Sequence, residues 1–297
     1  AGQAAPQYAV GAVLRSRHVM AVGDPAQIKP VIALEPSILQ LLCEKFEVSE
    51  KYISDSASVQ SLADSASKFG FYRLPEKTDE SWIGIPLWVH RRCKHPMFDI
   101  SNELSYGGLM VIGSEEGSQG KAGWYNVPGK AKNKYVQEQG DFLLEKLKEM
   151  EENSPGILKN VYIISPFTSI VDELDRKLRK LRFRKKNNLG TIHTFQGKEA
   201  KIVFLVLGAD NSSRGSANWA VSEENMMNVA ATRAKEEFYI IGDENLYRSL
   251  KTNTTNVTFK VLEDYNSSTQ PSEVSTAEPE DTTAAEPVQE STKKKAV

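Results

Sequence analysis

The sequence places an arginine where a helix is expected to continue with apolar residues. Met226, Val229 and Ala230 recur at helical spacing, and the next position on their apolar stripe is Arg233. A guanidinium is planar and permanently charged, so it can hold phosphate oxygens with a fork of N–H groups. A buried salt bridge is the structural alternative, and the local pattern alone leaves both roles open.

A second group of polar residues comes after an apolar run at residues 18–24, which is typical of a buried strand. The loop after it, in the stretch VGDPAQIKP, carries Gly23, Asp24 and Gln27. A side-chain amide both donates and accepts hydrogen bonds, so Gln27 could contact a phosphate oxygen together with a water. An ordinary loop explains the segment equally well.

A third candidate lies between two strand-like runs in TIHTFQGKEAKIVFLVLG. Gly197 allows the backbone to approach a ligand closely, Lys198 can bind phosphate, and Glu199 can accept a hydrogen bond from a hydroxyl. A polar hairpin loop is the alternative, and a buried run on each side makes it less natural.

The stretch PLWVHRRCKHPMF carries two arginines, Arg91 and Arg92, between apolar residues. His90, Cys93 and His95 lie beside them, but three ligands without a second Cys or His pair do not match a zinc site. The glycine-rich stretch GSEEGSQGKAGW does not match a phosphate-binding P-loop either, because the required glycine and the Ser or Thr after the lysine are missing.

Residues 176–186 contain eight lysines and arginines. Opposite them lies an apolar stripe at Ile170, Val171, Leu174, Leu178 and Leu181. A solvated helix face explains this pattern better than a dedicated nucleic-acid groove.

Helices and strands must alternate to position these segments. We expect helices at 8–16, at 37–46 with Ser37 as N-cap, at 58–70, at 135–151 and from 168. Strands are expected at 18–24, 161–165, 201–208 and 238–243, and a strand followed by a loop at 191–197. This alternation predicts an α/β fold, a parallel sheet with helices on both faces. Chemistry is expected at the carboxyl ends of its strands.

Composition and charge limit the class of protein and the compartment that the chain can belong to. The net charge is −2, and residues 266–297 hold six acidic residues, three lysines and no aromatic residue, so we expect this tail to be disordered. No apolar run approaches the roughly 18 residues of a membrane span. Two cysteines cannot form a disulfide framework, which favours a cytoplasmic protein, or a nuclear one in a eukaryote.

The ordered segments together resemble motifs III to VI of superfamily 1 helicases, most closely the family B group of Upf, Dna and Senataxin type. The matching strings are GDPAQIKP (III), VHRRCKHP (IV), IISPF (IVa), TFQGKEAKIVFL (V) and NVAATRAKEEFYIIGD (VI). In motif IV, Arg91 stands where an aromatic residue is usual and Lys94 is inserted, so either Arg91 or Arg92 could be the motif arginine.

The resemblance implies RecA-like lobes, with a helicase-like C-terminal domain of AAA type. Residues 1–83 would be the remainder of the first lobe, 84–263 a complete second lobe, and 264–297 the disordered tail. The start AGQAAPQ resembles the residues directly after the Asp-Glu pair of motif II, so the phosphate loop and the Mg²⁺ ligands are expected upstream of residue 1.

The resemblance also assigns roles, and it favours an Arg233 face that borders the cleft between the lobes. Arg233 and Arg92 would act on the γ-phosphate of ATP, with Gln27 as its sensor. Nucleotide contacts are expected at Gly23, Asp24, Gln27, Gly197, Lys198 and Glu199. Backbone contacts to a single strand of DNA or RNA are expected at Ser165, Pro166 and Thr194.

These roles describe the C-terminal portion of an ATP-dependent helicase or translocase, with ATP and Mg²⁺ as cofactors and no metal ligand in this chain. The chain alone is expected to be inactive. Two alternatives stay open: a non-catalytic nucleic-acid-binding scaffold with a degenerate helicase fold, and the helicase module of a defence or repair nuclease with additional domains in the same chain.

Overall fold

A parallel β-sheet lies at the centre of residues 121–242 in the computed structural model, which describes residues 1–30, 34–49, 52, 57–72, 82–113, 119–195 and 197–269. Its five strands lie in the order β5-β11-β10-β8-β9, and every neighbouring pair is parallel. They are β5 (Lys121–Asn126), β8 (Val161–Ser165), β9 (Leu189–Thr191), β10 (Ala200–Val206) and β11 (Ala234–Gly242).

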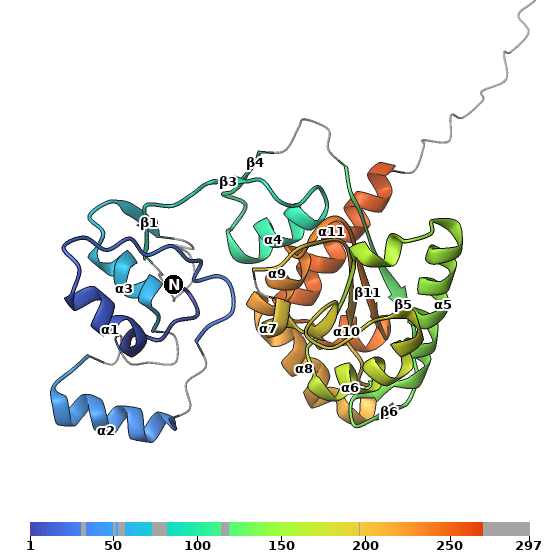
Figure 1. Cartoon of the computed structure of the whole chain (residues 1–297), viewed down its shortest axis with the longest axis horizontal. Coiled ribbons are helices and arrows are strands. Elements are labelled where there is room, and N and C mark those ends of the chain that lie inside the picture. The colour runs from blue at the N-terminus through green and yellow to red at the C-terminus, as the bar shows by residue number, and fades with distance from the viewer. Residues whose placement is uncertain are drawn as a thin grey trace, which may run out of the picture.

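Helices cover both faces of this sheet (Figure 1). Alternate strand residues point to opposite faces, so Ile163 and Phe204 join one core with α5 and α6, while Ile164 and Val203 join the other with α4 and α8 to α11. The helices are α4 (Met97–Ser105), α5 (Gln137–Asn153), α6 (Thr168–Lys177), α8 (Arg214–Ser222), α9 (Glu224–Ala231), α10 (Glu244–Leu250) and α11 (Asn253–Thr269). The α/β class with a RecA-like parallel sheet is therefore confirmed.

Residues 6–84 form smaller elements beside this sheet unit. They are α1 (Pro6–Leu14), α2 (Pro36–Phe46), α3 (Val59–Ala66) and an antiparallel pair of β1 (Gly70–Tyr72) and β2 (Trp82–Gly84). Because Gly84 pairs with Gly70, we propose that the boundary between the two lobes comes directly after β2.

Two helix ends differ from the sequence-based expectation. Ser37 is not an N-cap, because α2 begins at Pro36 and Glu35 takes the cap position, with proline in the first turn where its missing N–H is harmless. The helix expected over 58–70 ends at Ala66. Ser58 and Ser61 form its capping box.

The strand expected at residues 18–24 is wrong. The segment has no strand assignment, and Val19, Met20 and Val22 are 55%, 90% and 68% exposed. A strand needs a partner for its backbone hydrogen bonds, and none of the described strands pairs with this segment. These apolar side chains instead line an open cavity of about 1190 Å³ together with α1 and α3.

The expected disordered tail begins too early. α11 continues to Thr269, and within it Tyr265 donates a hydrogen bond from its hydroxyl to the Gly120 carbonyl at 2.5 Å. Phe259 packs on Trp124 with ring centroids 4.5 Å apart, which anchors the same helix to β5. Residues 270–297, the rest of that prediction, lie outside the described residues.

The connections complete the sheet unit. They contain the short helix α7 (Ile192–Phe195), the strand pairs β3 (Val89–His90) with β4 (Val111–Ile112) and β6 (Ala131–Lys132) with β7 (Tyr135–Val136), and the 3-10 turns Ile157–Asn160, Arg179–Leu181 and Asn211–Ser213. Of the strand and loop expected at 191–197, Thr191 ends β9 and residues 192–195 form a helix. None of the described helices is long and apolar enough to cross a membrane.

Candidate functional site

Arg233 lies in the junction between α9 and β11 and not in the helix, which ends at Ala231. Its side chain is 1% exposed and makes four hydrogen bonds. The acceptors are the Val229 carbonyl at 3.0 Å, the Lys198 carbonyl at 2.9 Å, the Phe195 carbonyl at 3.4 Å and the Thr232 hydroxyl at 3.1 Å.

This environment differs from both sequence-based alternatives for Arg233. The expectation that its face borders an open cleft is wrong for this structure, because the guanidinium is enclosed. A carboxylate salt bridge is not found either, since its hydrogen-bond acceptors among the described residues are carbonyls and a hydroxyl. Burial, followed by the nearby positive charge of Arg92, lowers the Arg233 pKa to about 10.

Arg92 lies beside Arg233 and is accessible. Its side chain is 34% exposed, and its Nε donates to the Glu199 carboxylate at 3.1 Å. One Nη atom reaches the Thr232 carbonyl at 3.4 Å. The chain therefore brings Arg92 to the Arg233 junction, which favours Arg92 over Arg91 as the motif arginine.

Glu199 joins two cations. Besides Arg92, Lys235 forms an ion pair with the same carboxylate, and the hydrogen bond from Lys235 is the largest cause that lowers the Glu199 pKa. Ala200 and Ala234 are paired at the start of β10 and β11, so this arginine cluster of Arg92, Glu199, Arg233 and Lys235 lies at the amino ends of those strands. The predicted residues Arg92, Glu199 and Arg233 thus lie at the amino ends of these strands and not at the carboxyl ends, where the sequence led us to expect them.

Gly197 and Lys198 come just before β10 in the chain and lie near the same edge of the sheet. Gly197 adopts φ of +81°, a left-handed conformation that favours glycine. Lys198 donates from Nζ to the Lys186 carbonyl at 3.0 Å and lies over the Phe195 ring. Its side chain is exposed, while its backbone carbonyl holds Arg233. Gln196 lies outside the described residues.

The loop of residues 23–27, called here the Asp24 loop, docks on the sheet unit. The Asp24 carboxylate accepts from the Ala26 amide at 2.9 Å, from the Gln27 amide group at 3.0 Å and from the Tyr106 hydroxyl. Asn228 of α9 donates to the Ala26 carbonyl at 3.0 Å. Gln27 is thus held by Asp24 at the contact between the loop and helices α4 and α9.

Tyr106 and Asn228 were missed by sequence reasoning. Asn228 is fully buried, and like Arg233 it is a polar residue within the apolar end of the motif VI string. That pattern was a usable signal for Asn228. Tyr106 comes directly after α4 in an unremarkable polar turn, and the sequence holds no sign of its bond to Asp24, 82 positions away.

The residues expected to contact a strand lie around β8 and β9. Ser165 pairs with Thr191 across these strands, and the Thr191 hydroxyl is 3.2 Å from that of Thr194. Ser165 is 0% exposed, and its hydroxyl accepts from the Phe167 amide at 3.4 Å. Pro166 and Thr194 are partly exposed, whereas the Ser165 side chain is not accessible at the surface.

No group of three or more His, Cys, Asp or Glu residues that could hold a metal ion occurs among the described residues. His90 accepts from the Cys93 amide at 3.0 Å, and His95 instead contacts Asp99 at 2.8 Å. Burial raises the Cys93 pKa to about 12, so the thiol stays protonated at neutral pH.

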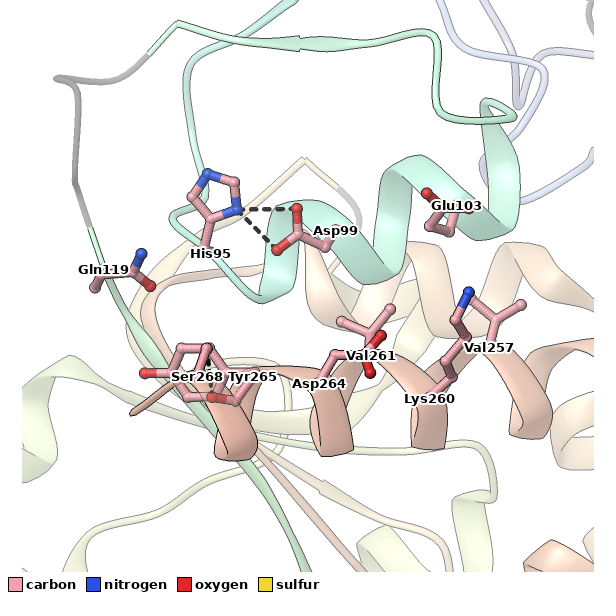
Figure 2. Close-up of a pocket in the computed structure, with 10 residues that line it drawn as sticks. All are labelled: His95, Asp99, Glu103, Gln119, Val257, Lys260, Val261, Asp264, Tyr265 and Ser268. Carbon is pink, nitrogen blue, oxygen red and sulfur yellow. Dashed lines mark hydrogen bonds and ion pairs between the residues drawn. The ribbon is translucent and has the colours of Figure 1, made fainter. Parts of the chain in front are cut away.

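A cavity of about 420 Å³ lies between α4 and α11, which also pack on each other (Figure 2). His95, Asp99 and Glu103 lie on the α4 side, and Lys260, Asp264 and Tyr265 lie on α11. None of the predicted site residues lines it. The candidate site is therefore the arginine cluster with the Asp24 loop, and not this cavity.

A family model described as AAA domain matches residues 87–245, which span the motif IV to VI segments and the whole parallel sheet. The chain belongs to the AAA domain family. Two relatives are named as helicases, which agrees with the resemblance of the motifs to superfamily 1 helicases.

Both relatives are curated proteins. The chain is 25% identical over 252 residues to an uncharacterized ATP-dependent helicase of Methanocaldococcus jannaschii, covering 80% of this chain and 34% of that protein. It is 24% identical over 255 residues to a DNA replication ATP-dependent helicase/nuclease of Gallus gallus, covering 82% of this chain and 22% of that protein. The chain thus spans about a third of the first relative and less than a quarter of the second.

Two solved helicase structures share local similarity with the chain. One is the C-terminal domain of a possible DNA helicase from Lactobacillus plantarum, with 12% identity, a TM-score of 0.33 and coverage of 51% of this chain and 86% of that chain. Another is the Arterivirus nonstructural protein 10 helicase in complex with DNA, with 17% identity, a TM-score of 0.31 and coverage of 58% of this chain and 30% of that chain.

Proposed function

We propose that this chain is the C-terminal portion of an ATP-dependent helicase or translocase that moves along a single nucleic-acid strand. The observation that carries the proposal is the convergence of Arg92, Glu199 and Arg233, from three distant segments, at one edge of the sheet. The Asp24 loop docks on the helix that leads into the same edge. Both curated relatives are named ATP-dependent helicases, which supports ATP as the substrate.

In this proposal Arg92 acts on the γ-phosphate of ATP. Phosphoryl transfer spreads negative charge over the γ-oxygens, and an arginine directed at them accelerates related reactions by roughly 10³–10⁵-fold. Arg92 is partly exposed and is oriented by Glu199, so it can turn toward an ATP held between two lobes. The hydrogen bond from Lys235 lowers the Glu199 pKa, and the ionised Glu199 carboxylate holds Arg92 at this edge.

Arg233 has a conditional role. Before its guanidinium can contact ATP, it must leave three carbonyls and a hydroxyl. We therefore infer that Arg233 becomes catalytic only after the junction between α9 and β11 rearranges. Gly197 and Lys198 lie beside this junction. A ligand that contacts them would disturb the hydrogen bond from Arg233 to the Lys198 carbonyl.

A single strand of DNA or RNA would contact the surface around Pro166 and Thr194. The nearby basic segment is less available than its composition indicates, because several of its cations are paired. The ion pairs are Arg176 with Glu173, Lys177 with Asp141, Arg179 with Asp175 and Lys185 with Asp172. Arg184 donates to the Arg179 and Phe183 carbonyls. The remaining cations of the segment, Lys180, Arg182 and Lys186, are therefore best placed for a sequence-independent, salt-sensitive contact with phosphates.

Magnesium does not fit the described residues, because they contain no cluster of carboxylates or histidines suited to a metal. The proposal therefore places the Mg²⁺ ligands, together with the phosphate-binding loop, in another part of a longer polypeptide.

The second candidate is a non-catalytic nucleic-acid-binding scaffold. The enclosure of Arg233 favours it, because a buried guanidinium with four satisfied hydrogen bonds can serve the fold alone. The name of the Gallus gallus relative also keeps open a nuclease in the same polypeptide.

Hydrolysis of ATP separates these candidates. A polypeptide that contains this chain and its preceding residues should hydrolyse ATP, and a single strand should stimulate the rate. Residues 1–297 alone should bind the strand without measurable turnover, because the sequence has no phosphate-binding loop. Strand binding without hydrolysis by the longer polypeptide would support the scaffold and reject the helicase.

A further inference from the structure

A series of hydrogen bonds connects the Asp24 loop to Arg233 through the buried part of the molecule. We propose that Asn228 and Tyr106 are positioning residues that couple the Asp24 loop, and with it Gln27, to Arg233. The inference rests on the proposed function, since it assigns these two residues a role in the use of ATP at the same site.

The series begins at Tyr106, the residue directly after α4. Its hydroxyl donates to the Asp24 carboxylate, which also holds the Gln27 side chain at 3.0 Å. The Asn228 amide group lies 3.4 Å from the same hydroxyl and can donate to it. A shift of Asp24 therefore disturbs Gln27 and the Tyr106–Asn228 contact together.

Asn228 forms the central connection. Its amide group donates to the Ala26 carbonyl at 3.0 Å, and its side-chain oxygen accepts from the Ser101 hydroxyl at 2.7 Å. The side chain is 0% exposed, so water cannot replace either partner. A buried polar group without a hydrogen-bond partner costs its full desolvation free energy. The Asn228 side chain therefore strongly favours the arrangement in which both of these hydrogen bonds are made.

The series ends at Arg233. The Asn228 carbonyl accepts from the Thr232 hydroxyl at 2.8 Å, and that hydroxyl in turn accepts from an Arg233 Nη atom at 3.1 Å. Arg233 Nε also donates to the Val229 carbonyl, one residue after Asn228. In the last turn of α9, the Asn228 side chain thus contacts the Asp24 loop. The backbone carbonyls of Asn228 and Val229 contact Thr232 and Arg233.

This series of hydrogen bonds would couple movement of the Asp24 loop to the position of Arg233. Engagement of Gln27 by the γ-phosphate would move the Asp24 loop, and the loop cannot move far without withdrawing the Ala26 carbonyl from Asn228. The end of α9 would then shift, and the carbonyls that hold Arg233 would shift with it. Arg233 would be released toward ATP only when the Asp24 loop is engaged.

Gln139 provides a matched control for the buried amide of Asn228. Its side chain is also 0% exposed and also makes two hydrogen bonds, to the Val127 carbonyl at 3.1 Å and from the Gly208 amide at 2.9 Å. It belongs to neither the Asp24 loop nor the arginine cluster. Gln139→Ala therefore reproduces the loss of a buried amide without interrupting the series.

The first measurement is amide hydrogen exchange on residues 1–297, which needs no ATP. Asn228→Ala should raise the exchange of the Ala26 and Gln27 amides by about 10-fold, the effect of losing one buried hydrogen-bond partner. Tyr106→Phe, which keeps the ring and loses only the hydroxyl, should raise it in the same direction. Equal exchange at these amides in Asn228→Ala and Gln139→Ala would overturn the coupling.

The second measurement is strand-stimulated ATP hydrolysis by the longer polypeptide. Asn228→Ala should lower kcat by about 10-fold with little change in KM, because the lost contact acts after ATP is bound. In an Arg233→Lys background the same change should have no further effect, since a residue that acts through Arg233 is not additive with it. A raised KM with unchanged kcat, or full additivity, would overturn the inference while the proposed function stands. If the unmodified polypeptide does not hydrolyse ATP, the proposed function fails, and the exchange measurement alone decides the coupling.

Discussion

Replacing Arg233 with alanine should lower the free energy of unfolding by roughly 2–4 kcal/mol. The loss has two parts in the structure. Four hydrogen bonds disappear, at about 1 kcal/mol each, and the truncated side chain leaves a cavity worth about 2 kcal/mol. Removal of the buried charge has the opposite effect and raises the free energy of unfolding.

The free energy cost of the buried charge follows from the Arg233 pKa. Burial lowers it from 12.5 to about 10, which corresponds to about 3 kcal/mol against the charged side chain in the folded state. The net effect of Arg233→Ala is still destabilising. Arg233→Met fills most of the cavity and also removes the charge, so it should destabilise by about 1–2 kcal/mol less than alanine.

Urea unfolding of residues 1–297 measures these differences. Arg176→Ala is the control, because Arg176 is 64% exposed and its carboxylate partner Glu173 lies at the surface, so its removal should change stability by less than about 1 kcal/mol. An Arg233→Ala protein as stable as the unmodified chain would refute the reasoning. The guanidinium would then be free in solution, as the sequence-based expectation of an open cleft requires.

Other contacts give three further predictions. Burial, then the charge of Arg92, lowers the His90 pKa from 6.5 to about 4, so the folded state binds this proton less tightly than the unfolded state. His90 is partly exposed, so solvent screening reduces the effect, and about 1–2 kcal/mol of stability should be lost as pH falls through that range. His90→Gln should remove that part of the pH dependence in urea unfolding. The slope of log affinity for a single strand against log salt should fall by roughly 2 when the three cations proposed for the strand contact become glutamate, namely Lys180, Arg182 and Lys186. An unchanged slope would return the segment to an ordinary solvated surface. Truncation after Thr269 should leave the Tm unchanged, whereas truncation after Glu263 removes the Tyr265 bond to Gly120 and should lower the Tm by several degrees. Equal Tm values for both truncations would show that the last turns of α11 do not stabilise the sheet unit.

The sheet and its covering helices could be predicted because their signals are local. Residues 161–164 of β8, 202–206 of β10 and 238–241 of β11 are continuous apolar runs, and α5 and α6 repeat apolar residues at helical spacing. The segment 18–24 has the same apolar run but forms no strand. Strand formation depends on a neighbour as well as on the segment itself, and no described strand pairs with it.

The candidate site was predictable in its residues but not in its geometry. Motif strings identified Arg92, Glu199 and Arg233, and the structure brings these three together. Whether Arg233 faces a cleft depends on the carbonyls of Phe195 and Lys198, which lie 38 and 35 positions earlier in the chain. Local periodicity contains no information about such distant groups.

The same limit explains the missed residues. Tyr106 and Asn228 acquire their roles through contacts with Asp24 and Ala26, which lie 82 and 202 positions away. A polar residue inside an apolar motif was a signal for Asn228. For Tyr106 only the folded arrangement reveals the contact.

Single-turnover hydrolysis by an Arg92→Ala variant of the longer polypeptide tests the central claim most directly. Arg92 is partly exposed, and its removal should change stability by less than about 1 kcal/mol, so a loss of activity cannot be attributed to unfolding. Arg248→Ala is the matched control, because Arg248 is a similarly exposed arginine in a carboxylate ion pair outside the site. We predict that Arg92→Ala slows hydrolysis of bound ATP by roughly 100-fold or more, while Arg248→Ala hydrolyses ATP at the unmodified rate. Equal hydrolysis rates for Arg92→Ala, Arg248→Ala and the unmodified polypeptide would contradict the account.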